Sequence, residues 1–295
     1  MAVKIENLEI DNLYIGSLKV DKLYLSEDLL YPSEQHDYSK DYLTFRITSA
    51  GTINWYASNS ASTKTISYSK DNGTTWNDIV STTGGTSISV VSGDKVMFKS
   101  INGNYSSADT VYNSFSGTTA SFEVQGNIMS LIYGDNFSGQ TSLSNDFTFN
   151  SLFMGCTTLT SAENLILPAT SIRTKCYQLM FKDCANLIKS PTILPATTLQ
   201  QYCYQQMFMN CSNLTTSPYL PATALVTNCY SNLFNGCSSL NYIKCLAISN
   251  RGNGYTTSWV SGVASTGTFV KNPSASTWGT SVNYCPPGWT QIDAS

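Results

Sequence analysis

The first 32 residues carry apolar side chains in a five-residue rhythm. Nine of them follow one another at alternating spacings of three and two: Ile5, Leu8, Ile10, Leu13, Ile15, Leu18, Val20, Leu23 and Leu25. This rhythm matches neither the helical period of about 3.6 nor the strand period of about 2. A chain that turns a corner every five residues, as in pentapeptide β-solenoids, would place all nine on one side.

So few short units cannot bury these nine apolar side chains by themselves, because solenoid repeats depend on stacked neighbours. We therefore expect residues 1–32 to be an attachment and oligomerisation stalk. Sister copies in a homotrimer, or a socket on a larger particle, would complete its apolar side. The alternative is an arm that packs on its own chain.

Strand-like alternation begins after a polar linker from Pro32 to Lys40. Leu43, Phe45 and Ile47 alternate with polar residues, and similar short runs continue to about residue 137. Turn signals rich in Gly, Asn and Asp separate these runs. Short alternating strands with such turns predict an antiparallel β-sandwich over residues 41–137.

A longer repeat replaces this alternation from about residue 138. Three units that begin with L-P-A-T start at Leu167, Leu194 and Leu220, so the period is 27 and then 26 residues. A degenerate unit precedes them. In the first full unit, helical spacing relates four apolar positions: Cys176, Met180, Cys184 and Leu187. One strand and one helix per unit predict a mainly β chain with α/β repeats, in which residues 138–295 form a leucine-rich-repeat-type solenoid.

The repeat units carry a family resemblance. Their pattern, L-P-A-T…C-Y-x-x-[ML]-F-x-x-C-x-x-L, resembles the BspA-type leucine-rich repeats of Bacteroides surface proteins and of related phage structural proteins. The tail GTFVKNPSASTWGTSVNYCPPGWT resembles that family's C-terminal cap, expected at about 266–295. The segment FSGTTASFEVQGNIMSLIYGDNF resembles the domain that commonly precedes such repeats.

The start of the chain resembles a different group of proteins. The segment KLYLSEDLLYP is similar to the start of phage virion proteins, including head fibres of crAss-like phages. The resemblance implies a virion fibre or decoration protein, assembled in the host cytoplasm. It would attach to other virion proteins through its N-terminus and display a binding domain for host-surface or mucosal glycans or proteins. A bacterial cell-surface adhesin of the BspA-like type is the alternative.

Composition limits the kinds of molecule that this chain is expected to bind. Charged residues make up only 12% of the chain and the net charge is -3, without Lys/Arg clusters. Nucleic-acid binding needs concentrated positive charge, so we expect no nucleic-acid partner. The charged N-terminus does not match a signal peptide, and no apolar run approaches the roughly 18 residues of a membrane span. These features fit a virion protein that needs no membrane.

Seven of the nine cysteines recur at repeat positions. One column holds Cys176, Cys203 and Cys229, and the other holds Cys156, Cys184, Cys211 and Cys237. On a helix, eight residues separate two thiols by about 12 Å, too far for a disulfide. We therefore expect buried, unpaired thiols in both columns, and only Cys245 or Cys285 remain open to disulfides. His36 is the only histidine and no zinc spacing occurs, so we predict neither a metal nor a cofactor.

Catalytic patterns are weak. The sequence SKDNGTTW from Ser69 to Trp76 matches an Asp-box, which in sialidases is a structural hairpin away from the active site, and we expect a turn. The chain has three arginines, Arg46, Arg173 and Arg251, and few carboxylates follow residue 140: Asp146, Glu163, Asp183 and Asp293. We expect no enzyme site, and a glycan-cleaving enzyme is the least favoured alternative.

Binding remains as the function to expect. Tyrosine, asparagine and glutamine side chains on one face of the repeats would stack on sugars and hydrogen-bond them. The candidates, chosen at variable repeat positions, are Tyr202, Gln205, Asn210, Asn228 and Asn232. The alternative is that they merely form the solvated face.

Overall fold

The computed structural model describes residues 13–15, 18–20, 23–25, 28–31, 36–249, 254–275 and 278–295. They belong to two compact units, Met1–Asp37 and Tyr38–Ser295. Strands account for 29% of the residues and helices for 5%. The chain is therefore mainly β, as the sequence predicts, with several open sheets.

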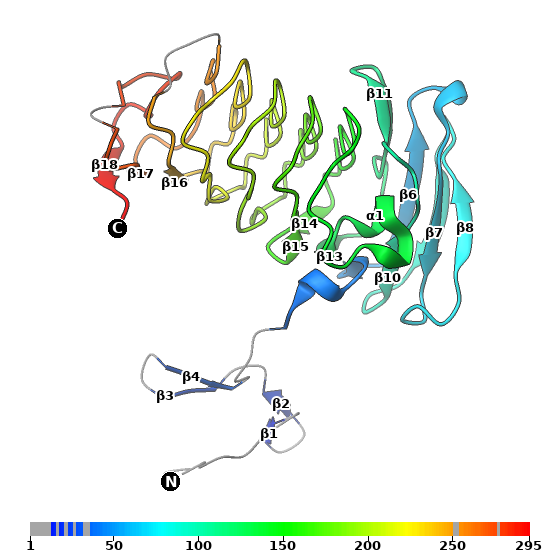
Figure 1. Ribbon diagram of the computed structural model, residues 1–295. Helices are drawn as coiled ribbons and strands as arrows, with labels where there is room; N and C mark the ends of the chain where they lie inside the picture. Colours follow the sequence, from blue (N-terminus) through cyan, green and yellow to red (C-terminus); the bar gives the residue numbers. More distant parts are fainter. Residues whose placement is uncertain are drawn as a thin grey trace. The chain divides into compact units, whose positions relative to one another are not determined.

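Short strands recur every five residues in the N-terminal unit (Figure 1). They are β1 (Leu13–Ile15), β2 (Leu18–Val20), β3 (Leu23–Leu25) and β4 (Asp28–Tyr31). β1 pairs with β2, and β3 with β4, both antiparallel. The pentad rhythm thus sets the spacing of the strands, but their pairing is antiparallel and not the parallel stacking of a β-solenoid. The predicted residues Ile5, Leu8 and Ile10 lie outside the described residues; the other six lie in β1, β2 and β3.

Antiparallel sheets form the first part of the second unit. Its elements are η1 (Tyr38–Lys40), β5 (Leu43–Ile47), β6 (Gly51–Ala57), η2 (Ser60–Ser62), β7 (Thr65–Ser69), β8 (Asn77–Val80), β9 (Thr86–Val90), β10 (Lys95–Lys99), β11 (Ser106–Ala108), β12 (Val111–Ser114) and β13 (Phe122–Asn127). One sheet has the order β13-β5-β10-β7-β8, and the other has β11-β12-β6-β9. We call residues 41–137 the two-sheet region. Tyr38–Lys40, predicted as linker, is a 3-10 helix and belongs to the compact unit.

An aromatic cluster joins the two sheets. Phe45 of β5 stacks on Phe122 of β13 with ring centroids 4.4 Å apart. It also meets Phe115 at 4.7 Å, and Phe115 meets Trp55 of β6 at 4.8 Å. All four side chains are fully buried. In β5, Leu43, Phe45 and Ile47 are buried and Arg46 is exposed, so alternation along the strand turns Phe45 toward this cluster, while Thr44 is buried on the other face.

The first sheet continues into the repeats without a break. After α1 (Ser130–Tyr133) and η3 (Gly134–Asn136), β14 (Leu159–Ser161) and β15 (Leu165–Ile166) both pair with β13 in parallel. Single parallel bridges then link each unit to the next, up to the sheet of β16 (Tyr242–Cys245), β17 (Thr268–Lys271) and β18 (Thr290–Asp293). We call residues 138–295 the repeat region. The change of architecture near residue 137 therefore lies inside one compact unit (Figure 1).

The helix predicted in each repeat is wrong, because the structure has consecutive turns there. In the first of these segments, alternate amides bond three residues back, as Asn150 N–H does to Phe147 C=O at 3.3 Å. The amides between them bond the next unit, as Phe149 N–H does to Cys176 C=O at 2.7 Å. Every fourth residue has a positive φ, for example 57° at Phe147 and 60° at Ser151. We call this path the four-residue turn ribbon.

A turn ribbon with four residues per step stacks equivalent side chains of successive units. Phe153, Phe181, Phe208 and Phe234 form one column, with centroids 5.3, 5.3 and 5.8 Å apart. Phe149, Tyr177, Tyr204 and Tyr230 form a second column at 5.7, 5.7 and 6.1 Å. Trp259 continues this second column and packs on Trp278 at 5.5 Å. The columns form the core of the repeat region, which the tryptophans close at the C-terminal end.

The nine cysteines are all described, buried and free. The thiols of Cys184, Cys211 and Cys237 each donate to a phenylalanine carbonyl one unit back, at 3.0 Å in every case. The helical distance used to exclude disulfides does not apply to a turn ribbon. The thiols are nevertheless buried core groups, as predicted, and Cys245 and Cys285 are free as well.

Candidate functional site

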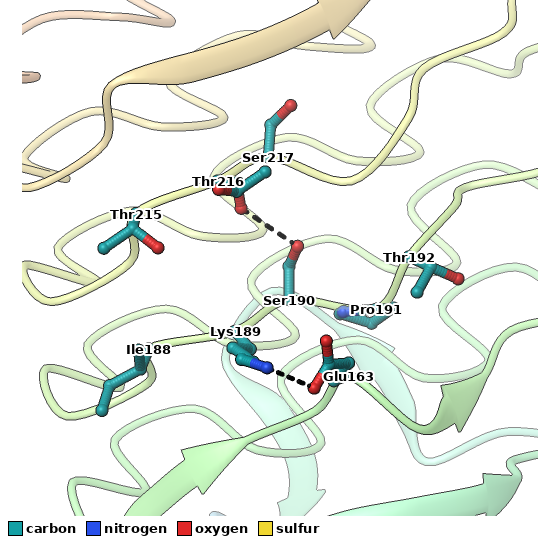
Figure 2. A pocket seen from close by; sticks show the side chains of 9 residues that line it. All are labelled: Glu163, Ile188, Lys189, Ser190, Pro191, Thr192, Thr215, Thr216 and Ser217. Atoms are coloured by element: carbon teal, nitrogen blue, oxygen red, sulfur yellow. Dashed lines mark hydrogen bonds and ion pairs between the residues drawn. The ribbon is translucent and has the colours of Figure 1, made fainter. Parts of the chain in front are cut away.

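A hollow of about 300 Å³ opens on the strand side of the repeat region (Figure 2). Three successive units contribute to it. The first gives Glu163, the second gives residues 188–192, and the third gives residues 215–217. A volume of this order lies at the small end of ligand sites, which span about 300–1,000 Å³.

An unequal repeat length shapes the hollow. Lys189 bridges Thr216, and Ile193 bridges Tyr219, so four steps along one unit face three steps along the next. The extra residue makes the period 27 in one unit and 26 in the next, and Thr192 falls within the longer segment. An additional residue on one of two paired segments bends that segment, as in a β-bulge. The hollow thus lies where the longer segment of one unit faces the shorter segment of the next.

Polar and apolar groups line the hollow together. Lys189 Nζ lies 2.6 Å from Glu163 Oε2, and the two side chains are 55% and 46% exposed. The Ser190 hydroxyl donates to the Thr216 carbonyl at 3.2 Å. Figure 2 shows the ion pair, this hydrogen bond, and the threonines that line the site. Ile188, 48% exposed, supplies apolar surface. Together they offer donors, acceptors and an apolar wall to a hydroxyl-rich ligand.

The sequence did not single out any residue that lines this hollow as a ligand residue. In the sequence, Glu163 stands out only as one of the few carboxylates after residue 140. The usable signal was the difference between periods of 27 and 26, which marks an irregular segment between Ser190 and Leu194. A length difference does not say whether the extra residue forms a loop, a bulge or a hollow.

The five ligand-face candidates all lie on the turn ribbon, and none lines the hollow. Four of them, Tyr202, Asn210, Asn228 and Asn232, have φ values between 53° and 62°. Asparagine is among the few residues that adopt this conformation readily. The backbone therefore explains the asparagines at these positions without a ligand.

Most candidate side chains also bond within the repeats. The Gln178 amide donates to Gln205 Oε1 at 2.6 Å, and the Asn210 amide donates to Asp183 Oδ1 at 2.7 Å. The Lys175 ammonium lies 5.4 Å from the centroid of the Tyr202 ring. These residues form ladders between units, which is a structural role.

The Asp-box segment forms a closed turn, as the sequence predicts. Asp71 Oδ1 accepts from the Thr75 amide at 2.9 Å, and Oδ2 accepts from the Thr75 hydroxyl at 2.7 Å. These bonds, the side-chain bond first, lower the pKa of Asp71 to about 2. The Trp76 ring lies 4.2 Å from the Lys99 ammonium. The carboxylate is committed to its own turn.

The other candidate catalytic carboxylates each interact with a different neighbouring group. Asp183 pairs with Lys182 at 3.0 Å, and Asp293 pairs with Lys271. Asp146 accepts from the Thr174 amide at 3.1 Å. Arg46 lies 3.6 Å from Glu123, and Arg251 lies outside the described residues.

Neither a metal cluster nor a membrane-spanning helix is found in the described part of the chain. Within the described residues, no three His, Cys, Asp or Glu side chains gather as a metal site would require. The helices of the described part of the chain are all too short or too polar to cross a bilayer.

The hollow is thus a feature of the described surface that can take a small ligand. Comparison of the chain with protein-family models, with curated proteins and with solved structures finds no match.

Proposed function

We propose that the chain is a virion fibre or decoration protein that displays a non-catalytic, carbohydrate-binding site. The hollow bounded by Glu163, Lys189 and Thr216 carries the binding part of this proposal. Sugars present hydroxyl groups together with apolar C–H faces. The hollow offers a carboxylate, an ammonium and hydroxyls beside the exposed Ile188 side chain.

The repeat region suits display because it shares a sheet, and one compact unit, with its neighbour. Parallel bonds from β13 to β14 and β15 join the two-sheet region to the first repeat. In this proposal the two-sheet region is a β-sandwich, and the repeat region is a leucine-rich-repeat-type solenoid whose turn ribbon replaces the helix. A rigid support holds a weak site in a fixed orientation.

The virion part of the proposal rests on the N-terminal pentad rhythm and on the resemblance to phage proteins. Three copies would assemble through the apolar stalk and attach to other virion proteins. Several weak sites linked in this way bind a surface more tightly than one site alone.

A glycan microarray probed with the full chain tests the binding function. We expect glycan signals that are lost in the Lys189→Met variant, together with no release of sugar from the same glycans. Turnover that disappears in Glu163→Gln would replace this proposal with a glycan-cleaving enzyme. An array without signal would refute carbohydrate binding.

Light scattering tests the display architecture. We expect a trimer for the full chain and a monomer for a variant that lacks residues 1–32. A monomer in both cases would favour a solitary cell-surface adhesin over a fibre.

A further inference from the structure

The ligand of the hollow is open to further definition because a row of outward side chains continues beyond it. Parallel bridges connect Ser161, Lys189, Thr216, Tyr242, Thr268 and Thr290 in this order. Bridged residues of parallel strands lie on the same side, about 4.8 Å apart from one strand to the next. We call these six residues the outer row.

Tyr242 is the aromatic member of the outer row. In β16 the residues alternate between half-buried and buried, so Tyr242 and Lys244 face outward while Ile243 and Cys245 face the core. Tyr242 bridges Thr216, which lines the hollow, and its carbonyl accepts from the amide of Ser217 at 3.0 Å. Its ring therefore stands one strand beyond the hollow, on the same side of the sheet.

The charge of the hollow is balanced. Lys189 and Glu163 neutralise each other at 2.6 Å, and among the described residues no other charged side chain lines the hollow. The positive charge of Lys189 is already compensated by Glu163. The negative charge of an acidic sugar would therefore be repelled by the Glu163 carboxylate without a free cation to balance it. A neutral sugar donates a hydroxyl hydrogen to Glu163 and accepts one from Lys189, and both charged groups are then used.

We propose that the site binds a neutral oligosaccharide that lies along the outer row. One sugar unit occupies the hollow beside the Glu163–Lys189 ion pair, and the next unit stacks on the Tyr242 ring. This inference rests on the proposed carbohydrate-binding function and defines its ligand class. Thr268 and Thr290 extend the row with hydroxyls for further units.

Binding of defined probes to the full chain tests the inference by calorimetry. The neutral probes are tetrasaccharides of N-acetyllactosamine, glucose and mannose with their monosaccharides, and the acidic probe is a hyaluronan tetrasaccharide. We expect a neutral tetrasaccharide to bind about tenfold tighter than its monosaccharide, as the stacking of one ring would provide. Tyr242→Ala removes this advantage, and Tyr242→Phe retains it.

Two variants provide controls. Tyr202→Ala removes a half-buried tyrosine from the turn ribbon of the same region and should leave every affinity unchanged. Glu163→Gln distinguishes the ligand classes by sign: it weakens a neutral sugar by removing a charged acceptor, whereas it strengthens an acidic sugar by removing a repulsive charge.

The outcomes separate the inference from the function on which it rests. Equal affinities for a neutral tetrasaccharide and its monosaccharide would overturn the extended site but leave carbohydrate binding in place. Binding of the acidic probe alone, strengthened in Glu163→Gln, would overturn the neutral class. Absence of binding to every probe, together with a silent microarray, would overturn both.

Discussion

The two-sheet region and the repeat region both bury aromatic residues in β structure, but they satisfy their buried polar groups differently. In the two-sheet region each group finds an individual partner. The buried Tyr105 hydroxyl, for example, donates to the Leu131 carbonyl at 2.7 Å. In the repeat region a side chain meets copies of itself, so a good contact recurs, as in the column of Phe153 and Phe181.

Repetition also copies unfavourable contacts. Among the described residues, the buried hydroxyls of Tyr177 and Tyr204 lack a hydrogen-bond partner, and both stand at the same position of successive units. The thiols are distributed in the same way: every cysteine lies at or after Cys156, and the two-sheet region has none. A repeat therefore multiplies whatever one unit contains, whereas an irregular core adjusts each group singly.

The largest effect is expected from alkali. Burial raises the pKa of Cys176, Cys229 and Cys245 to about 12, above the ordinary value of 9.0. Because the thiol pKa is higher in the folded state, the contribution of the protonated thiols to stability is complete below pH 9. This contribution is lost as the pH rises toward 12. Each such thiol lowers the free energy of unfolding by up to about 1.4 kcal/mol per pH unit in this window. For these three thiols together the loss is about 4 kcal/mol per pH unit, so over two to three pH units it becomes comparable with the roughly 5–15 kcal/mol that stabilises a domain.

Urea unfolding between pH 6 and 11, followed by circular dichroism, measures this effect. We expect a flat free energy of unfolding up to pH 8 and a steep fall above pH 9, with iodoacetamide labelling of the cysteines beginning in the same range. A constant free energy of unfolding across the whole series would contradict the burial of the thiols.

Tyrosine-to-phenylalanine substitutions sharpen the comparison of the two regions. Tyr177→Phe and Tyr204→Phe remove unpartnered hydroxyls, so each should raise the free energy of unfolding by about 1 kcal/mol. Phe149 already occupies this column in the preceding unit. Tyr105→Phe should instead lower stability by about 1 kcal/mol because it breaks bonded contacts.

Chemical denaturation of the three single variants measures these shifts. Opposite signs in the two regions are the expected result. Destabilisation by Tyr177→Phe equal to that of Tyr105→Phe would show that the repeat hydroxyls have partners after all.

A smaller effect concerns the backbone of the turn ribbon. Asn228 has a φ of 53°, and the equivalent position one unit later is Gly254, with a φ of 70°. Asn228→Ala should lower the free energy of unfolding by about 1 kcal/mol, because alanine disfavours a positive φ. Thermal unfolding measures this as a lower midpoint temperature. Asn228→Gly is the matched control and should lie close to the parent. Equal loss in both variants would assign the effect to the side chain and not to the backbone.

The smallest effect lies in the Asp-box turn of the two-sheet region. Thr75→Val removes the hydroxyl that contributes most to lowering the pKa of Asp71 to about 2. Because the pKa of Asp71 is lowered in the folded state, its ionised carboxylate stabilises the turn at pH values above the ordinary pKa of 3.8. This stabilisation is lost as the pH falls toward 2. The Asp71 pKa in the variant, followed by NMR titration, should move up toward 3.8. An unchanged titration would mean that the backbone amides hold the carboxylate by themselves.

Alternation was a sufficient guide in the two-sheet region. Leu43, Phe45 and Ile47 are buried as their spacing predicts, because side chains of a strand alternate between two faces whatever the strand pairs with. Spacing was an insufficient guide in the repeats. Positions i, i+4 and i+8, such as Cys176, Met180 and Cys184, share a face on a helix and also on a ribbon with four residues per step. In the last full unit, asparagine and glycine stand at every fourth position (Asn228, Asn232 and Gly236), which is a signal for the ribbon, but the same positions of the first full unit hold Lys175, Leu179 and Asp183.

The candidate site was harder still to foresee. The polar residues chosen from the sequence, such as Gln205 and Asn210, bond to neighbouring units, whereas the hollow arises where Thr192 lengthens one unit. Neither fact follows from the composition of a single repeat.

The sequence by itself determined the periods of five, two and 26 to 27 residues, the positions that share a column and the burial of the cysteines. These follow from which residues are apolar and how they are spaced. The tertiary structure alone decided the path of the backbone between columns, the role of each polar side chain and the place of the hollow. The physical reason is that the deciding hydrogen bonds join residues one unit apart, as from Tyr177 N–H to Cys203 C=O. A partner that distant in the chain is not specified by local spacing.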